Sequence, residues 1–309
     1  MSKTCPFAFT TILLTCLCPF FGCTSTGPQQ WSIGVYEGTN PFELRPAADT
    51  VNPVLTAAHV TDVSAEFVAD PFMVREDGTW FMFFEVMNAK TRQGDIGLAT
   101  SDDGLHWRYQ RIVLDEPFHL SYPCVFRWGD GTYMIPESHQ AGGVRLYKAD
   151  RFPDRWSFVG VLLRGGYVDP TVFRYNDRWW MFAGIGDASL HLFGADHLKG
   201  PWTPHPKSPV VTGTADVARP GGRVVMVSGR PVRFAQDDFP TYGNQVRAFE
   251  ITRLTLTDYE EREVPGKAVL SAGGRGWHAD GMHHIDAHKL AEDRWFACVD
   301  GCRLRPAHR

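Results

Sequence analysis

Short apolar runs recur along the chain, and they come in pairs separated by polar turns rich in Asp, Asn and Gly. The clearest pair covers residues 69–74 and 80–85, with a polar gap at 75–79 between the two runs. Two such runs around a short polar turn are typical of a β-hairpin. Helical periodicity is nearly absent after residue 31. The pattern therefore predicts an all-β chain assembled from hairpins.

The hairpin pattern returns at a regular interval. Further copies begin at Tyr122-Pro123, Asp169-Pro170, Arg219-Pro220 and near Asp280, after the first at Asp70-Pro71. The copies start roughly 50 residues apart, and a strand-built period of about 40–50 residues is the signature of a propeller. We therefore predict a five-bladed β-propeller of four-stranded antiparallel blades.

The last copy is too short to form a blade by itself, because only eight residues follow Gly301. Residues 33–36, Ile-Gly-Val-Tyr, resemble the strand Ile-Gly-Leu-Ala at 96–99, which follows the first hairpin. We expect residues 31–46 to complete the last blade and to pair with residues 294–299. Such closure leaves no open sheet edge at the ends of the chain.

The N-terminus has a different composition from the rest of the chain. A Lys near the start precedes an apolar run at 7–21, followed by small residues, which predicts a secretory signal over residues 1–23. Phe-Gly-Cys ending at Cys23 resembles a bacterial lipobox, so we expect a lipidated Cys23; an ordinary cleaved signal is the alternative. Residues 24–30 form the expected tether and 31–309 the propeller. The protein is expected to be exported, as a membrane-anchored lipoprotein or in the periplasm or medium.

Composition narrows the class of partner. The net charge is −4, so no basic field favours nucleic acid. Aromatic residues make up 13% of the chain, and they suit both sheet packing and stacking on sugars. We therefore expect a monomer that binds carbohydrate and contacts the membrane only through its anchor.

Three cysteines remain beyond the leader: Cys124, Cys298 and Cys302. An odd number gives no closed disulfide framework. Cys298 and Cys302 can pair with each other, or all three can be buried free thiols. No zinc-type cysteine spacing is present, and we expect no cofactor.

In a propeller, equivalent positions of the repeat converge on one axial pocket. Acidic and other polar residues gather at two such positions, at the start of the first strand and the end of the second. They are Asp70, Tyr122, Asp169, Arg219 and Asp280, and Glu85, Glu137, Gln236, Asp237 and Asp300. Carboxylates flanked by apolar residues are rarely buried without a partner or a task.

Converging carboxylates are what glycoside hydrolysis requires, because one protonates the leaving oxygen and another activates water or attacks. We predict Asp70, Glu137 and Asp169 as catalytic residues. The predicted substrate-binding residues are Glu85, Tyr122, Arg219, Gln236, Asp237, His278, Asp280, His283 and Asp300. Capping of turns, hydrogen bonds to backbone amides and structural ion pairs are the alternative roles for these side chains.

A second polar cluster lies late in the chain. His284, Asp286 and His288 alternate, so on a strand they share one face. That alternation could bind a metal or could serve hydrogen bonds within the fold, and we assign no metal site to it.

The motifs Ala-Asp-Pro at 69–71 and Val-Asp-Pro at 168–170 resemble those of the five-bladed arabinanase, xylosidase and fructosidase superfamily. The resemblance implies that Asp70 is the base and that Asp169 tunes neighbouring pKa values. Those enzymes place the acid Glu in the fourth blade, which here offers Arg219, Gln236 and Asp237. Glu137 in the second blade is the substitute that the sequence offers.

A closer resemblance is to the N-terminal domain of plant glucosamine inositolphosphorylceramide transferases and its bacterial stand-alone relatives. It is carried by residues 118–123, 134–138, 200–202, 218–222, 236–237 and 242–243. The resemblance implies that transferase chemistry belongs to a separate C-terminal domain of the plant proteins. We therefore expect a glycosidase-like propeller, with a glycan-binding propeller that does not hydrolyse as the alternative.

Overall fold

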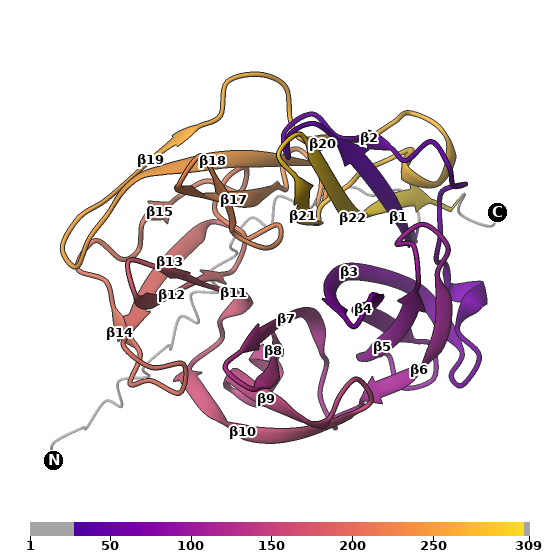
Figure 1. Ribbon diagram of the computed structural model, residues 1–309, viewed down its shortest axis with the longest axis horizontal. Coiled ribbons are helices and arrows are strands. Elements are labelled where there is room, and N and C mark those ends of the chain that lie inside the picture. The colour runs from indigo at the N-terminus through magenta and orange to yellow at the C-terminus, as the bar shows by residue number, and fades with distance from the viewer. Residues whose placement is uncertain (1–27, 306–309) are drawn as a thin grey trace, which may run out of the picture.

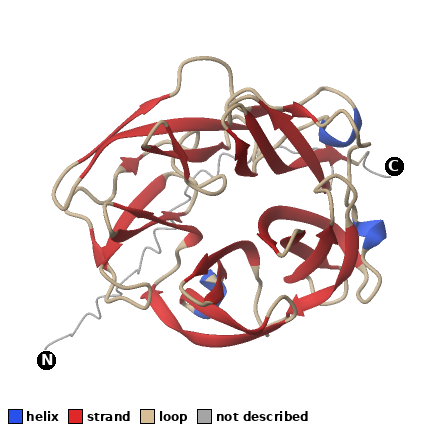
Figure 2. Cartoon of the chain, in the orientation of Figure 1, coloured by secondary structure: helices blue, strands red, loops and turns tan. Residues whose placement is uncertain are grey.

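The computed structural model describes residues 28–305, and this part of the chain forms a ring of five antiparallel sheets around a central axis (Figure 1). Three short 3-10 turns interrupt the strands and loops of this region (Figure 2). The predicted all-β, five-bladed propeller is confirmed. The predicted signal, Cys23 and the first part of the tether lie outside the described residues.

The first three blades follow one another in the chain. Blade 1 contains β3 (Ala65–Glu76), β4 (Thr79–Asn88), β5 (Gln93–Ser101) and β6 (Arg108–Leu114). Blade 2 contains β7 (Ser121–Trp128), β8 (Gly131–Glu137), β9 (Gly143–Arg151) and β10 (Arg155–Arg164). Blade 3 contains β11 (Val168–Tyr175), β12 (Arg178–Ile185), β13 (Ser189–Ala195) and β14 (Thr203–Pro204), and β15 (Val211–Thr212) also pairs with β13.

The last two blades bring the ends of the chain together. Blade 4 contains β16 (Val225–Val227), β17 (Arg230–Asp237), β18 (Gln245–Leu254) and β19 (Tyr259–Glu263), and β20 (Leu270–Ser271) also pairs with β18. Blade 5 contains β21 (Ile285–Ala291), β22 (Arg294–Leu304), β1 (Gln29–Gly38) and β2 (Arg45–Pro46). In the ring, β3, β7, β11 and β21 lie nearest the axis (Figure 1).

The predicted closure is confirmed. Strand β1 pairs antiparallel with β22 along its whole length, from Gln29 opposite Leu304 to Gly38 opposite Trp295. The sheet begins earlier than the expected tether boundary, because Gln29 and Gln30 are already paired. Backbone pairing over the full strand leaves no unpaired edge between the first and last segments of the described chain.

The repeated X-Pro motif of the inner strands forms a bulge. In blades 1, 2 and 3 the register slips beside the second strand at Asp70, Tyr122 and Asp169. These residues have φ of 52°, 46° and 50°. Positive φ is costly for residues with a side chain, and bulges turn side chains out of their regular alternation. The motif therefore marks three equivalent points where the strand is bent beside the axis.

A buried ion pair between Arg223 and Asp286 links residues of four blades. Arg223 donates from Nε to Asp286 Oδ1 at 2.6 Å and from Nη2 to the carbonyls of Met73 and Val125. Met73 N and His288 Nε2 reach Asp286 Oδ2 at 2.6 and 2.9 Å. Asp286 is fully buried, so these contacts supply the partners that its charge requires.

The same contacts explain the polar alternation on β21. Asp286 is occupied by Arg223 and His288, whereas His284 donates from Nε2 to Pro71 O at 3.0 Å. The three side chains therefore serve hydrogen bonds within the fold. Cys124, Cys298 and Cys302 are buried free thiols, so Cys298 and Cys302 form no disulfide with each other.

Candidate functional site

A cavity of about 420 Å³ opens on the axis, and all five blades contribute to its wall. Its size falls in the range of ordinary small-ligand sites. The polar lining residues are Gln29, Asp70, Glu85, His119, Ser121, Glu137, His139, Gln140, Arg219, Tyr242 and His283. Five of the residues predicted from the sequence thus line one cavity: Asp70, Glu85, Glu137, Arg219 and His283.

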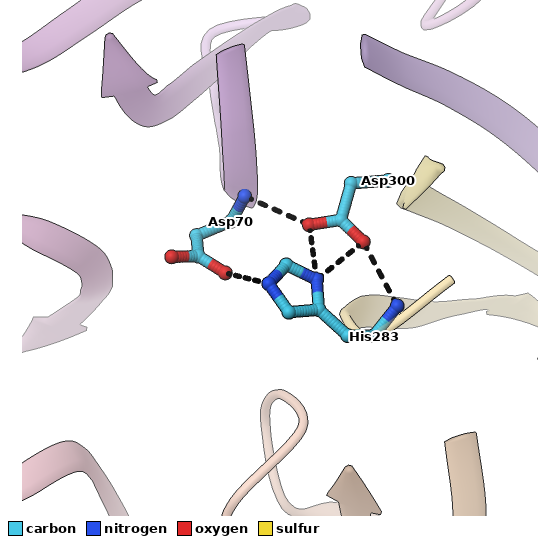
Figure 3. A group of neighbouring side chains, drawn as sticks. All are labelled: Asp70, His283 and Asp300. Atoms are coloured by element: carbon cyan, nitrogen blue, oxygen red, sulfur yellow. Dashed lines mark hydrogen bonds and ion pairs between the residues drawn. The ribbon is translucent and has the colours of Figure 1, made fainter. Parts of the chain in front are cut away.

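Asp70 belongs to a buried network that joins the first blade to the last (Figure 3). His283 Nδ1 lies 2.8 Å from an Asp300 oxygen, and its Nε2 lies 3.7 Å from Asp70 Oδ1. Asp300 also accepts the backbone N–H groups of Asp70, His283 and His284. Asp300 therefore fixes both the His283 ring and the bulge that carries Asp70.

The network sets the charges of its members. Burial opposes protonation of His283, but the Asp300 carboxylate outweighs burial and raises the pKa of His283 to about 9. Burial likewise opposes ionisation of Asp300, and the facing His283 lowers its pKa overall. At neutral pH the pair is an imidazolium and a carboxylate. Burial raises the pKa of Asp70 to about 7 in spite of the nearby His283 charge.

Asp169 sits directly behind the cavity wall, where it is 1% exposed. Arg219 Nε donates to its Oδ2 at 2.5 Å, and Gln236 Nε2 donates to the same oxygen at 3.0 Å. Burial raises the pKa of Asp169 to about 6, and Arg219 opposes that rise. The Arg219 guanidinium also lies 5.3 Å from the centre of the Tyr242 ring. Arg219 thus connects Asp169 with the cavity.

Glu137 ends β8 and lines the cavity beside a histidine. His139 Nδ1 lies 2.5 Å from Glu137 Oε1. His139 opens the 3-10 turn His139–Ala141, which follows the strand at once. The hydrogen bond with Glu137 raises the pKa of His139.

Glu85, at the equivalent end of the second strand of blade 1, has a weaker partner. His119 Nε2 lies 3.5 Å from Glu85 Oε1, while Gly94 N donates to His119 Nδ1 at 2.9 Å. Burial lowers the pKa of His119. Burial, followed by the charges of Asp70 and Glu137, raises the pKa of Glu85 well above its usual range.

Six residues predicted to bind substrate lie outside the lining, and four of them are Tyr122, Gln236, Asp237 and Asp300. Tyr122 is fully buried and its hydroxyl meets Thr171 at 2.7 Å. Gln236 supports Asp169, Asp237 accepts from Gln245 at 2.6 Å, and Asp300 holds His283. Of these four residues, Asp300 holds a residue of the lining, and Gln236 holds Asp169, which in turn contacts Arg219 of the lining.

The structure corrects the alignment of the fifth repeat. Asp280 is exposed and accepts a hydrogen bond from Leu304 N, and His278 is half-buried outside the cavity lining. Gly281 pairs with Cys302 and Ile285 with Val299, so three residues, Met282 to His284, face two on β22, and of these three His283 lines the cavity. A histidine therefore stands where blades 1 and 3 carry Asp70 and Asp169.

Several lining residues were not selected from the sequence: Trp31, His119, His139, Gln140 and Tyr242. His119 and His139 flank the ends of predicted strands, so a search for polar residues next to those ends could have found them. Trp31 and Tyr242 come from loops and strands that only ring closure brings together.

One group of acids and histidines within residues 28–305 is compact enough to hold a metal ion: Asp70, His283 and Asp300. The Asp300 carboxylate already receives three backbone N–H groups and the His283 ring. These hydrogen bonds stabilise the negative charge of Asp300 without a metal ion. Within the same range, no helix is long and apolar enough to cross a membrane.

The fold defines a class: a five-bladed propeller with an axial cavity rich in carboxyl groups, the fold of several glycoside hydrolases of known structure. A putative glycoside hydrolase from Parabacteroides distasonis superposes with a TM-score of 0.61 at 14% identity, covering 84% of this chain and 97% of that one. An exo-1,5-α-L-arabinanase from a bovine ruminal metagenomic library gives 0.56 at 17% identity, covering 79% and 94%. At these identities the likeness concerns the fold alone.

The chain belongs to the family described as "Glucosamine inositolphosphorylceramide transferase 1, N-terminal", which matches residues 23–302. Proteins named glucosamine inositolphosphorylceramide transferase 1 from Oryza sativa subsp. japonica and Arabidopsis thaliana are 38% and 35% identical over 307 residues. Each match covers 92% of this chain but only 41% and 40% of the plant proteins. The predicted family resemblance is confirmed.

Proposed function

We propose that the protein hydrolyses a glycosidic bond within the axial cavity. The observation that carries the proposal is that Asp70 and Glu137, on different blades, line the same cavity. The same cavity is also lined by Glu85, so carboxyl groups from two blades meet in it. Hydrolysis needs carboxyl groups on two sides of a sugar ring, and convergence on the axis supplies them.

Asp70 is the proposed general base. Its pKa is raised to about 7, so its carboxylate accepts a proton from water with useful driving force near neutral pH. The Tyr122 backbone N–H, 3.3 Å from Oδ2, orients the group. The water oxygen then bonds to the anomeric carbon as the bond from that carbon to the leaving oxygen breaks.

Asp169 and Arg219 set the field around the reacting centre. Asp169 is held beside the lining by Arg219 and Gln236, so it contributes negative charge near a sugar whose ring gains positive charge. The leaving oxygen takes its proton from another carboxyl group of the cavity, for which the sequence suggested Glu137.

The test is a screen of the purified protein against glycan libraries, with released sugars measured by chromatography. Glucosamine-containing glycans are the first probes, because the plant relatives carry glucosamine in their name. Asp70→Asn is expected to lower turnover by about 10²–10⁴-fold with little loss of binding. Asp293→Asn, on an exposed turn, is the matched control and should leave turnover unchanged.

A glycan-binding propeller without hydrolysis is the second candidate. It is favoured by the fourth blade, where Arg219 stands in place of an acid and neutralises Asp169. Under this candidate the wild type turns over none of the glycans that it binds. Asp70→Asn would then weaken binding, because a sugar hydroxyl loses a charged acceptor.

We also propose that the protein is exported and anchored through Cys23, on the sequence argument alone. Cys23→Ser is expected to move the protein from the membrane fraction to the soluble fraction of its host. Unchanged membrane association of the variant would contradict lipidation at this residue.

A further inference from the structure

We infer that Glu85, rather than Glu137, is the group that protonates the leaving oxygen. This inference rests on the proposed hydrolysis and names one residue within it. It comes from comparing the partners of four carboxyl groups, those of Asp70, Glu85, Glu137 and Asp169.

Three of the four groups face a cation of their own. Asp169 meets Arg219 at 2.5 Å. Glu137 meets His139, whose pKa the contact raises, at 2.5 Å. Asp70 lies 3.7 Å from His283, which Asp300 holds in its charged form. A nearby positive charge favours the ionised form of a carboxyl group, and at Asp70 and Asp169 it opposes the rise in pKa that burial causes.

Glu85 is the exception. Its neighbour His119 accepts a hydrogen bond from Gly94 N at Nδ1, so the ring carries its proton on Nε2, which faces Glu85 Oε1 at 3.5 Å. Burial lowers the pKa of His119, which keeps the ring neutral. Within residues 28–305 no hydrogen bond shorter than this contact reaches the Glu85 carboxyl group, and no cation pairs with it.

The surroundings of Glu85 favour its protonated form. The residue is 6% exposed and shares the cavity with Asp70 and Glu137, whose charges oppose a further negative charge. The neutral His119 lies 3.5 Å from one oxygen without forming a hydrogen bond to it, so His119 supplies neither a charge nor a close donor to hold Glu85 in its ionised form. A carboxyl group that stays protonated near neutral pH, lines a substrate-sized cavity and lies among carboxylates is suited to be a general acid.

The proton balance of the reaction is complete with these groups. Glu85 gives its proton to the glycosidic oxygen as the carbon–oxygen bond breaks, and the product alcohol leaves. Water bonds to the anomeric carbon and gives its proton to Asp70. The catalytic cycle closes when Asp70 releases a proton to solvent and Glu85 regains one.

Dependence on the leaving group tests the assignment. The probes are an unactivated disaccharide and the 2,4-dinitrophenyl glycoside of the same sugar, whose leaving group needs no protonation. Glu85→Gln is expected to lower disaccharide turnover by about 10²–10⁴-fold and to leave dinitrophenyl glycoside turnover close to that of the wild type. Glu137→Gln is the matched comparison and should lower both rates together.

The opposite pattern, with selective loss of disaccharide turnover in Glu137→Gln, would overturn the inference and leave the proposed hydrolysis intact. Absence of turnover by the wild type on every glycan would instead remove the hydrolysis and the donor role with it. Unfolding temperatures of both variants show whether either change acts through folding.

Infrared difference spectroscopy provides a readout that needs no substrate. At about pH 8, where Asp70 with its pKa of about 7 is mostly ionised, the wild type should show a protonated carboxyl stretch that is lost in Glu85→Gln. The band should persist in Glu292→Gln, a change on an exposed turn. Identical wild-type and Glu85→Gln spectra in this region would mean that Glu85 is ionised, which rules it out as the donor.

Discussion

The ring of Trp31, close to the start of the described chain, stacks on the ring of His283, close to its end. Their centroids are 4.0 Å apart and their planes differ by 22°. Trp31 lies on β1, the strand that closes the propeller, and His283 faces Asp70 in the cavity. The strand that completes the ring therefore also holds one wall of the candidate site.

Trp31→Ala should destabilise the protein by about 3–5 kcal/mol, because it removes a large side chain that is only 3% exposed. It should also loosen His283, which loses its stacking partner. Urea unfolding measures the first effect. Trp128→Ala is the control, since Trp128 is 41% exposed and should cost less. Equal losses in the two variants would show that Trp31 does not support the closure.

Asp70→Asn should stabilise the protein above neutral pH. The pKa of Asp70 is raised by burial to about 7 in the folded state, so the native protein binds a proton that the unfolded chain releases. The stabilisation that comes from protonated Asp70 is fully present below the pKa that Asp70 has in the unfolded chain. This stabilisation is lost as the pH rises through the folded-state pKa of about 7. At about pH 8 the variant should be more stable by a few kcal/mol, on the order of 1.4 kcal/mol per unit of pKa shift.

The measurement is urea unfolding of the wild type and Asp70→Asn between about pH 4 and about pH 8. The two curves should diverge as the pH rises. Stability curves that run parallel over this range would contradict a raised pKa at Asp70. A gain in stability on removing a charged group is expected of a residue kept for function.

Arg219→Gln should cost about 3–5 kcal/mol, because it leaves the buried Asp169 carboxylate without its cation. The double variant Arg219→Gln with Asp169→Asn should recover part of that loss, since no buried charge then remains unpaired. Chemical unfolding of the double-mutant cycle gives the coupling. Arg92→Gln breaks the exposed contact with Glu66 and should cost less than about 1 kcal/mol. Absence of any recovery in the double variant would argue against the pair.

Gly222→Ala should prevent stable folding. A Cβ at Gly222 would lie 1.8 Å from Ile285 O, and the φ of 139° disfavours any side chain. Gly213→Ala is the matched control, because its φ of 80° is also positive but nothing lies within 4 Å of the added carbon. That control should cost about 1–2 kcal/mol. The yield of soluble protein and the unfolding temperature are measured for both variants. Equal yields and equal unfolding temperatures would contradict the close approach of Gly222 to Ile285.

The sequence by itself determined the architecture. Alternating apolar runs and Gly- and Asp-rich turns are local signals, and their repetition at a fixed interval implies equal blades around an axis. The truncated last repeat also determined the closure, because a blade lacking strands must take them from elsewhere in the chain. The repeat positions of Asp70, Glu85, Glu137 and Asp169 predicted which acids approach the axis.

The partners of those acids were decided only by the tertiary structure. Asp70 and Asp300 are 230 residues apart, yet the backbone N–H of one meets the carboxylate of the other. The fifth repeat was misaligned because it lacks the Asp-Pro motif, and there His283 rather than Asp280 faces Asp70. The charge of each carboxyl group depends on whether Arg219, His139, His283 or a neutral His119 stands beside it. Such neighbours come from different blades, and no local pattern in the chain encodes their proximity.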